Sequence, residues 1–359
     1  MVSCDSWLSW SISVRMNPRM GYPEIPLQVD VGTTEPARRT QTMTLVTPDT
    51  ELTLSYHNQR AVVSPWGASL RRYFFIDADG QEIDIVWGYS GGSGKRGGQG
   101  DVLIPFPGRI GNGQYSFDGQ VFQLDCNDKE GPNAIHGFVR SLPWQVQDVH
   151  ANKVTFEIRL DAETYAGRGY PFSLAVRVMY DLGASGLTCT FTVRNEGQQA
   201  APVGVGFHPY FTVGTSVIDE AEAQIPGAAS VEFNEWLVPT GKILSVTGTP
   251  WDYRRFRGIG HQRFNHCYVQ LERDAQGMAT ASLRHPASGR VIDMIMDPAF
   301  FAVVVYTGDA IADAPRAALA IEPMTCASDA FNHPDWGLKR LVPGETFSGR
   351  YAVRHRVIS

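Results

Sequence analysis

Cysteine is scarce and scattered in this chain of 359 residues. The sequence contains no C-x-x-C pair and no cluster of cysteine with histidine. A disulfide framework or a structural zinc site needs such spacing, so we expect reduced thiols in a cytoplasmic protein. The five cysteines are Cys4, Cys126, Cys189, Cys267 and Cys326.

Long apolar runs are also missing. No stretch approaches the roughly 18–20 residues that a membrane-spanning helix needs, and the N-terminus lacks the apolar core of a signal peptide. The charged residues, 31 basic and 37 acidic with a net charge of −6, are interspersed rather than clustered. We therefore expect no binding to membranes or nucleic acids. His261 and His266 lack an acidic companion at a usual ligand spacing, so no metal site is expected.

What the sequence does contain, from about residue 44 onward, is alternation with a period of two. "KVTFEIRL" (153–160) and "LTCTFTVRN" (187–195) have an apolar residue at every second position, so these residues share one face, as in half-buried strands. Asp79-Gly80, Asp118-Gly119 and Gly289 interrupt this pattern where hairpin turns need a positive φ. No amphipathic helix is evident. We predict one all-β domain over 44–359, a large antiparallel β-sandwich, preceded by a disordered extension over 1–43.

Two further stretches bear on the architecture. "FFAVVVYTG" (300–308) is a continuous apolar run, which predicts a strand buried on both faces. The glycine-rich stretch "GYSGGSGKRGGQGD" (88–101) lacks the strand-to-helix setting of a phosphate-binding loop, and no Ser or Thr follows Lys95. We interpret it as a flexible loop.

Four ionisable residues lie in short motifs of the kind that surround a ligand. Arg109 lies in "PFPGRIGN", His136 in "NAIHG", His208 in "FHPYF" and Glu322 in "ALAIEP". Taken singly, each has an ordinary structural explanation, such as a salt bridge or a satisfied core histidine. Their order, followed by "DAFN" (329–332) and "LVPGETFSGRYAV" (341–353), resembles the aldose 1-epimerase (galactose mutarotase) family from about residue 44 to the C-terminus.

The resemblance implies a sandwich of the galactose mutarotase type with a groove for one monosaccharide. It also implies roles: Glu322 matches the catalytic base, and His208 matches the acid that donates to the ring oxygen. His136 and Arg109 match residues that contact the sugar. Where the family commonly has an aspartate that binds sugar hydroxyls, "FNHCY" places Asn265, which has no charge. No cofactor is implied.

Interconversion of α and β anomers needs a proton taken from the anomeric hydroxyl and one given to the ring oxygen. We expect the apolar run before Glu322 to raise the pKa of its carboxyl. We expect Pro323 to end strand pairing, which frees the carboxylate to face the groove. A carboxylate beside His208 is expected to keep that imidazole protonated near pH 7.

Three functions stay open at this point. The first is a mutarotase acting on a free aldohexose; the second is the same chemistry on a phosphorylated or sulfonated hexose; the third is a non-catalytic sugar-binding protein. The second needs extra cations, for which the candidates are Arg140, Arg168 and the pairs at 71–72 and 254–255. Aromatic side chains that can pack on a sugar are Phe207, Tyr210, Trp144 and Trp236. A monomer or a homodimer is expected.

Overall fold

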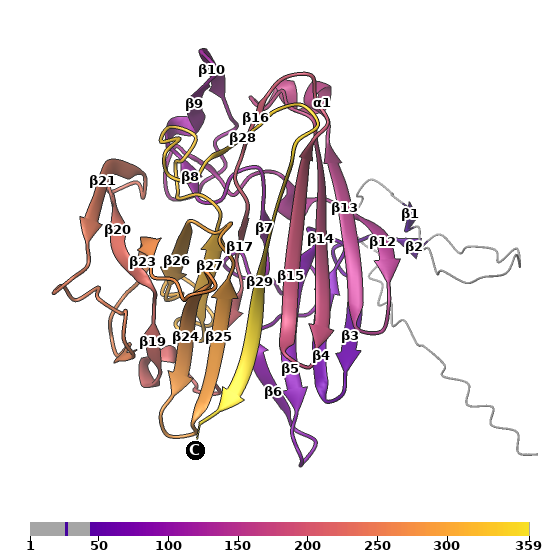
Figure 1. Ribbon diagram of the computed structural model, residues 1–359. Helices are drawn as coiled ribbons and strands as arrows, with labels where there is room; N and C mark the ends of the chain where they lie inside the picture. Colours follow the sequence, from indigo (N-terminus) through magenta and orange to yellow (C-terminus); the bar gives the residue numbers. More distant parts are fainter. Residues whose placement is uncertain (1–25, 28–43, 359) are drawn as a thin grey trace, which may run out of the picture.

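The computed structural model describes residues 26–27 and 44–358 (Figure 1). Most of the extension predicted over 1–43 lies outside the described residues, so its disorder stays a prediction. The two residues that are described there form β1 (Pro26–Leu27), which pairs with β2 (Thr44–Leu45). The division into an extension and one domain likewise stays a prediction.

Two large antiparallel sheets make up most of the protein. The first is nine-stranded and faces the viewer in Figure 1, where β29 runs in yellow between β15 and β25. Its strands, in spatial order, are β12 (Gln145–Val149), β13 (Lys153–Leu160), β14 (Leu174–Gly183), β15 (Gly186–Asn195), β29 (Thr346–Val357), β25 (Arg290–Met296), β24 (Ala279–His285), β19 (Glu222–Gln224) and β22 (Arg257–Gly258).

The second sheet is twelve-stranded and carries the residues of the candidate site. Ten strands form its main path: β21 (Pro239–Ser245), β20 (Gly227–Phe233), β23 (Asn265–Leu271), β26 (Ala302–Tyr306), β27 (Leu319–Met324), β18 (Tyr210–Phe211), β6 (Glu82–Val86), β5 (Ser69–Ile76), β4 (Gln59–Ser64) and β3 (Leu52–Tyr56). Two short strands, β17 (Gly206–Phe207) and β7 (Val102–Leu103), pair beside β27.

The remaining elements are short. Paired strands outside the two sheets are β8 (Arg109–Ile110) with β11 (Ala134–Ile135), β9 (Gln114–Phe117) with β10 (Gln120–Gln123), and β16 (Ala201–Val203) with β28 (Lys339–Leu341). The helices of the described residues are α1 (Ala162–Ala166) and the 3₁₀ turns η1 (Gly111–Gly113), η2 (Val139–Ser141) and η3 (Ile218–Glu220). The predicted all-β sandwich is therefore confirmed. Across the described chain, no helix is long and apolar enough to cross a membrane.

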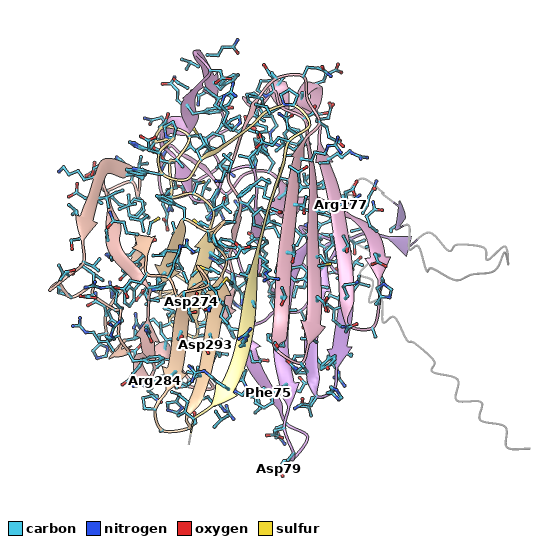
Figure 2. All side chains as sticks on the ribbon, in the orientation of Figure 1. Phe75, Asp79, Arg177, Asp274, Arg284 and Asp293 are labelled. Atoms are coloured by element: carbon cyan, nitrogen blue, oxygen red, sulfur yellow. The ribbon has the colours of Figure 1, made fainter. Side chains whose placement is uncertain are left out.

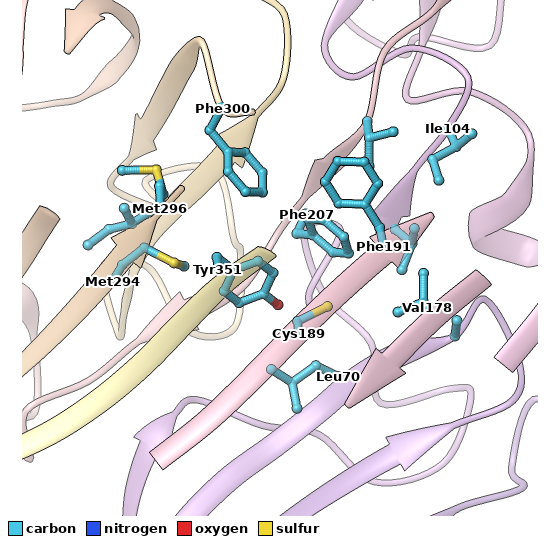
Figure 3. Close-up of a cluster of buried hydrophobic side chains, with 14 of the residues drawn as sticks. Leu70, Ile104, Val178, Cys189, Phe191, Phe207, Met294, Met296, Phe300 and Tyr351 are labelled. Carbon is cyan, nitrogen blue, oxygen red and sulfur yellow. The ribbon is translucent and has the colours of Figure 1, made fainter. Parts of the chain in front are cut away.

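The core lies between the two sheets, as the alternation predicted. On β15, Leu187, Cys189, Phe191 and Val193 are fully buried, and the residues between them are not. Figure 3 shows how side chains from both sheets meet: Phe191 and Tyr351 come from the nine-stranded sheet, and Phe207 comes from the other. The Phe207 and Tyr351 rings are 4.9 Å apart. Burying each such ring contributes roughly 1.5–3 kcal/mol.

The predicted turns lie where the strands reverse. Asp118 and Gly119 join β9 to β10, and both have positive φ angles, 47° and 79°. This is the conformation of a two-residue hairpin whose twist matches that of its strands. Gly80 and Gly289, with φ angles of 79° and 66°, lie in the β5–β6 and β24–β25 connections.

Candidate active site

Glu322 lies inside a strand, which corrects the expectation for Pro323. Strand β27 continues through Pro323 to Met324, and Glu322 is paired with Val304 of β26. The amide N–H groups of Ile321 and Thr325 donate to the backbone carbonyls of Pro209 and Val205, on the other side of β27 from β26. The backbone nitrogen of Pro323 points to that side as well. On that side the pairing is interrupted between β17 and β18, around His208, where Pro323 and Pro209 have no N–H to donate. Pairing with β26 continues on the opposite side, so Pro323 does not end the strand.

His208 occupies this interruption and faces Glu322. Its backbone is held by the segment before β7. The His208 amide donates to the backbone carbonyl of Asp101 at 3.0 Å, and the Gly100 amide donates to the backbone carbonyl of His208 at 2.9 Å. The Nε2 atom of His208 lies 3.4 Å from Oε1 of Glu322. The two residues are only 6% and 3% exposed. The sheet therefore buries an acid and a base side by side.

Burial decides the charges of this pair. Loss of hydration raises the pKa of Glu322 well above its usual value, although the Arg109 cation acts in the opposite direction. Loss of hydration also lowers the pKa of His208 to about 3, with the Arg140 cation adding to the effect. The expectation of a protonated His208 is therefore wrong for the ligand-free site. The pair holds one proton, and burial keeps that proton on the carboxyl group.

His136 lies beside the pair in a fixed orientation. Its ring centroid is 5.7 Å from that of His208. The His136 amide donates to the Gly108 carbonyl at 3.0 Å, and the Gly108 amide donates to Nδ1 of His136 at 3.2 Å. Because Nδ1 accepts a hydrogen bond, the proton of the neutral ring is on Nε2. Burial lowers the pKa of His136 well below its usual value, with the nearby His208 adding to the effect.

Arg109 is held by two carboxylates rather than standing free. Its Nε donates to Asp128 and its Nη2 to Glu130, each at 2.7 Å. Arg109 is paired with Ile135, the residue before His136, and its cation acts on the pKa values of both Glu322 and His136. The fixed fork of the guanidinium suits this double contact. Arg109, His136, His208 and Glu322 are therefore brought together in one part of the structure.

The glycine-rich stretch packs on His208, which the sequence interpretation missed. A Cβ atom on Gly98 would lie 3.1 Å from Cδ2 of the His208 ring, and Gly98 has a φ of 79°. The Gly97 carbonyl accepts a hydrogen bond of 2.7 Å from the hydroxyl of Tyr210. Only glycine combines this φ with so close an approach. The glycines at 97, 98 and 100 were the available signal, and the stretch forms a wall of the site.

A buried carboxylate anchors this wall. Asp101 is 1% exposed and forms ion pairs with Lys95 and with Arg140, whose Nη1 is 3.5 Å away. Both cations act on the pKa of His208. No motif singled out Asp101, because its two partners come from the glycine-rich stretch and from η2, which only the fold brings together.

Asn265 lies further along the same face of the sheet. It is paired with Tyr306 of β26, while Val304 of β26 is paired with Glu322. Residues paired directly across antiparallel strands share a face, as do residues two apart on one strand. Asn265, Tyr306 and Glu322 therefore share one face. Asn265 is exposed in a groove of about 440 Å³ that Tyr306 and Glu130 also line.

The run at 300–308 is only partly buried, contrary to prediction. Strand β26 is central, but Val304 and Tyr306 are only partly buried, because both lie on the face of the sheet that carries Glu322, where Tyr306 lines the groove. The sequence could not distinguish this face from a second buried one, because valine and tyrosine occur on both.

The aromatic candidates divide between core and site. Trp144 and Phe207 are buried in the core, with exposures of 0% and 2%. Tyr210 stacks on His208 at a centroid distance of 5.1 Å. Trp236 is 48% exposed, and its carbonyl accepts a hydrogen bond from Asn133.

A larger groove, of about 630 Å³, lies elsewhere. It is lined by Phe75 and Asp293, both labelled in Figure 2, and by residues 354–356 at the end of β29. It contains none of the predicted site residues, so size alone does not select the site. Among residues 26–27 and 44–358, no three His, Cys, Asp or Glu side chains are placed to hold a metal ion.

The fold and the buried acid–base pair define a class of protein: large two-sheet β-sandwiches with a carboxyl and an imidazole facing each other across neighbouring strands. The family model described as "Aldose 1-epimerase" matches residues 50–354. The chain belongs to this family.

Relatives and solved structures agree with this assignment. The chain is 34% identical over 234 residues to the uncharacterized protein YihR of Escherichia coli K12, covering 65% of this chain and 71% of the relative. It is 29% identical over 315 residues to the galactose mutarotase of Bos taurus, covering 80% and 88%. The structure of a GalM/aldose epimerase homologue from C. elegans superposes with a TM-score of 0.76 at 20% identity, covering 86% and 99%. At that identity the likeness shows the fold alone.

Proposed function

We propose that the protein is an aldose 1-epimerase, an isomerase that interconverts the α and β anomers of a free aldohexose. The observation that carries the proposal is the 3.4 Å contact between His208 Nε2 and Glu322 Oε1 in a buried site. His136 and Arg109 surround this pair. A protein that only binds sugars has no need for a buried acid and base in contact.

The reaction moves two protons and breaks one bond. Glu322 takes the proton of the anomeric hydroxyl while His208 gives a proton to the ring oxygen. The bond from C1 to the ring oxygen breaks, and C1 becomes an aldehyde. Rotation about C1–C2 presents the other face, and the same groups reverse their roles on closure. Each well-placed acid or base contributes roughly 10²–10⁴ in rate.

The ligand-free pair must first shift its proton. Burial places the proton on Glu322, so a transfer from Oε1 to Nε2 across 3.4 Å produces the carboxylate and the imidazolium. Arg109 favours the carboxylate form, because its cation lowers the pKa of Glu322. Its ion pairs with Asp128 and Glu130 hold it near the carboxyl group.

His136 positions the sugar in this proposal. Because Nδ1 accepts from Gly108, Nε2 is the donor left for a ligand. A neutral donor can bind a sugar oxygen without competing with His208 for the transferred proton. Asn265, further along the face, donates or accepts for a hydroxyl at the other end of the sugar.

Anomer exchange followed by NMR tests this proposal. The panel is glucose, galactose, glucose 6-phosphate and a sulfonated hexose, each with catalytic amounts of protein. Faster exchange of a neutral sugar supports the proposal. Binding without acceleration of any sugar on the panel would contradict it and would favour a sugar-binding protein.

A second candidate, a mutarotase for a phosphorylated or sulfonated hexose, is favoured by Lys95 and Arg140. Both are near His208, and they share a single carboxylate, Asp101. Of the cations that the sequence suggested, all except Arg140 lie in separate ion pairs. Arg71 pairs with Glu51, Arg72 with Glu82 and Asp84, Arg168 with Asp125, and Arg254 and Arg255 with Glu272.

Arg140→Gln distinguishes the two candidates, with Arg168→Gln as the matched control. If an anionic group binds beside Arg140, kcat/KM for the charged sugar falls by more than about tenfold, since hydrogen bonds to charged groups contribute roughly 1.5–3 kcal/mol. Exchange of glucose then falls less than exchange of the charged sugar, and any fall reflects the contacts of Arg140 with Asp101 and its effect on His208. An equal effect on neutral and charged sugars would rule out the anionic subsite.

A further inference from the structure

Tyr306 lies between the two ends of the candidate site. It is the β26 residue paired with Asn265 on one side and with Ala320 of β27 on the other. Glu322 lies two residues beyond Ala320, on the same face. A ligand that reaches from the acid–base pair to Asn265 along this face therefore passes over Tyr306.

The phenol group of Tyr306 is fixed and keeps a donor free. The Ala310 amide donates to the Tyr306 oxygen at 3.2 Å, so the hydroxyl acts as acceptor in that bond. No hydrogen bond donated by this hydroxyl is found among the described residues. Burial and the carboxyls of Glu130, Asp309 and Glu322 raise the pKa of Tyr306, so the phenol keeps its proton at neutral pH.

The groove around Tyr306 has the size and chemistry for a sugar. Its volume of about 440 Å³ falls within the range of small-molecule sites. Tyr306 is half-exposed and supplies an apolar ring, beside the uncharged amide of Asn265. Glu130, which holds Arg109, lies on the same groove. Through Glu130 the groove adjoins Arg109, whose cation acts on the pKa of Glu322.

Resting on the proposed function, we infer that Tyr306 is a specificity-determining residue of the sugar site. Its ring forms the floor on which the C–H face of the substrate packs. Its hydroxyl donates to one substrate hydroxyl between the anomeric carbon and the end bound by Asn265. The direction of that hydroxyl then selects among aldohexose epimers. Tyr306 takes no part in proton transfer.

A double-mutant cycle between the enzyme and its ligand tests this inference. Wild type and Tyr306→Phe are titrated with methyl β-glucoside and with its monodeoxy analogues. These glycosides do not ring-open, so their Kd values report binding apart from catalysis. Tyr56→Phe is the control, because Tyr56 is a partly buried tyrosine of β3 that lies outside the groove.

One deoxy analogue is expected to bind wild type about three- to tenfold more weakly than the parent, the range of a neutral hydrogen bond. Tyr306→Phe should bind both equally, and on the free sugar it should raise KM with kcat unchanged. Equal weakening of every ligand by the variant, or a fall in kcat alone, would overturn the inference. If wild type binds the glycosides but accelerates no free sugar, the proposed function fails while the cycle still measures the role of Tyr306.

Discussion

Replacing the buried Glu322 with glutamine should make the protein more stable at neutral pH while removing its activity. The carboxyl group is 3% exposed, and burial raises its pKa well above the usual value. Glutamine has nearly the same shape and can still contact Nε2 of His208, but it is neutral without binding a proton. The variant therefore keeps the side-chain contacts of residue 322 and removes only the free energy needed to keep a proton on the buried carboxyl group.

The sign follows from proton binding. Above a pH of roughly 4.5 the unfolded chain has lost the proton of Glu322, whereas the folded protein retains it. For this group the folded state then binds more protons, so the contribution of Glu322 to the free energy of unfolding of wild type falls as pH rises. The slope from this one group reaches about 1.4 kcal/mol per pH unit and ends above the folded pKa. Glu322→Gln lacks that slope, so its advantage grows from pH 5 upward.

Urea unfolding of both proteins between pH 4 and pH 8 measures the difference. Glu220→Gln is the control, because Glu220 is exposed in η3 and its removal should leave the slope unchanged. If the free energies of unfolding of wild type and Glu322→Gln change in parallel with pH, the reasoning is refuted, since Glu322 would then have the same pKa in the folded and unfolded states.

Three further outcomes follow from the same geometry. The value of kcat/KM should stay level as pH falls from 7 to 5, because the pair keeps its one proton until His208, with a pKa of about 3, takes a second; a decline centred near pH 6.5 would contradict this. Gly98→Ala should lower kcat/KM at least severalfold, because a Cβ would lie 3.1 Å from the His208 ring at a φ of 79°; unchanged kinetics would show that the wall gives way. Arg109→Lys should lower kcat/KM by more than about tenfold, because lysine cannot hold Asp128 and Glu130 with a rigid fork; full activity would show that charge alone suffices.

The fold was predictable because alternation and turn chemistry are local. The strands at 153–160 and 187–195 have one buried face, which a period of two reveals directly. Asp118 and Gly119 fix their own hairpin through their φ angles. Neither prediction depends on which strand lies next to which.

The short motifs predicted which residues belong to the site, but not their environment. Glu322 and His208 were named from short stretches, but their protonation depends on burial that the neighbouring strands create. Pro323 was misjudged because β26, on its other side, keeps β27 paired through the proline, and the sequence does not show which strands are neighbours. Asp101 and Tyr306 were missed because partners distant in the sequence give them their roles.

Anomer exchange at equilibrium tests the acid–base assignment most directly. Two-dimensional exchange NMR on the preferred sugar would be run with wild type and Glu322→Gln at equal, saturating ligand. The assignment predicts that the variant binds the sugar with a similar Kd and loses roughly 10²–10⁴ of the enzymatic rate. Exchange by the variant at the wild-type rate would show that Glu322 is not the base and would contradict the central claim.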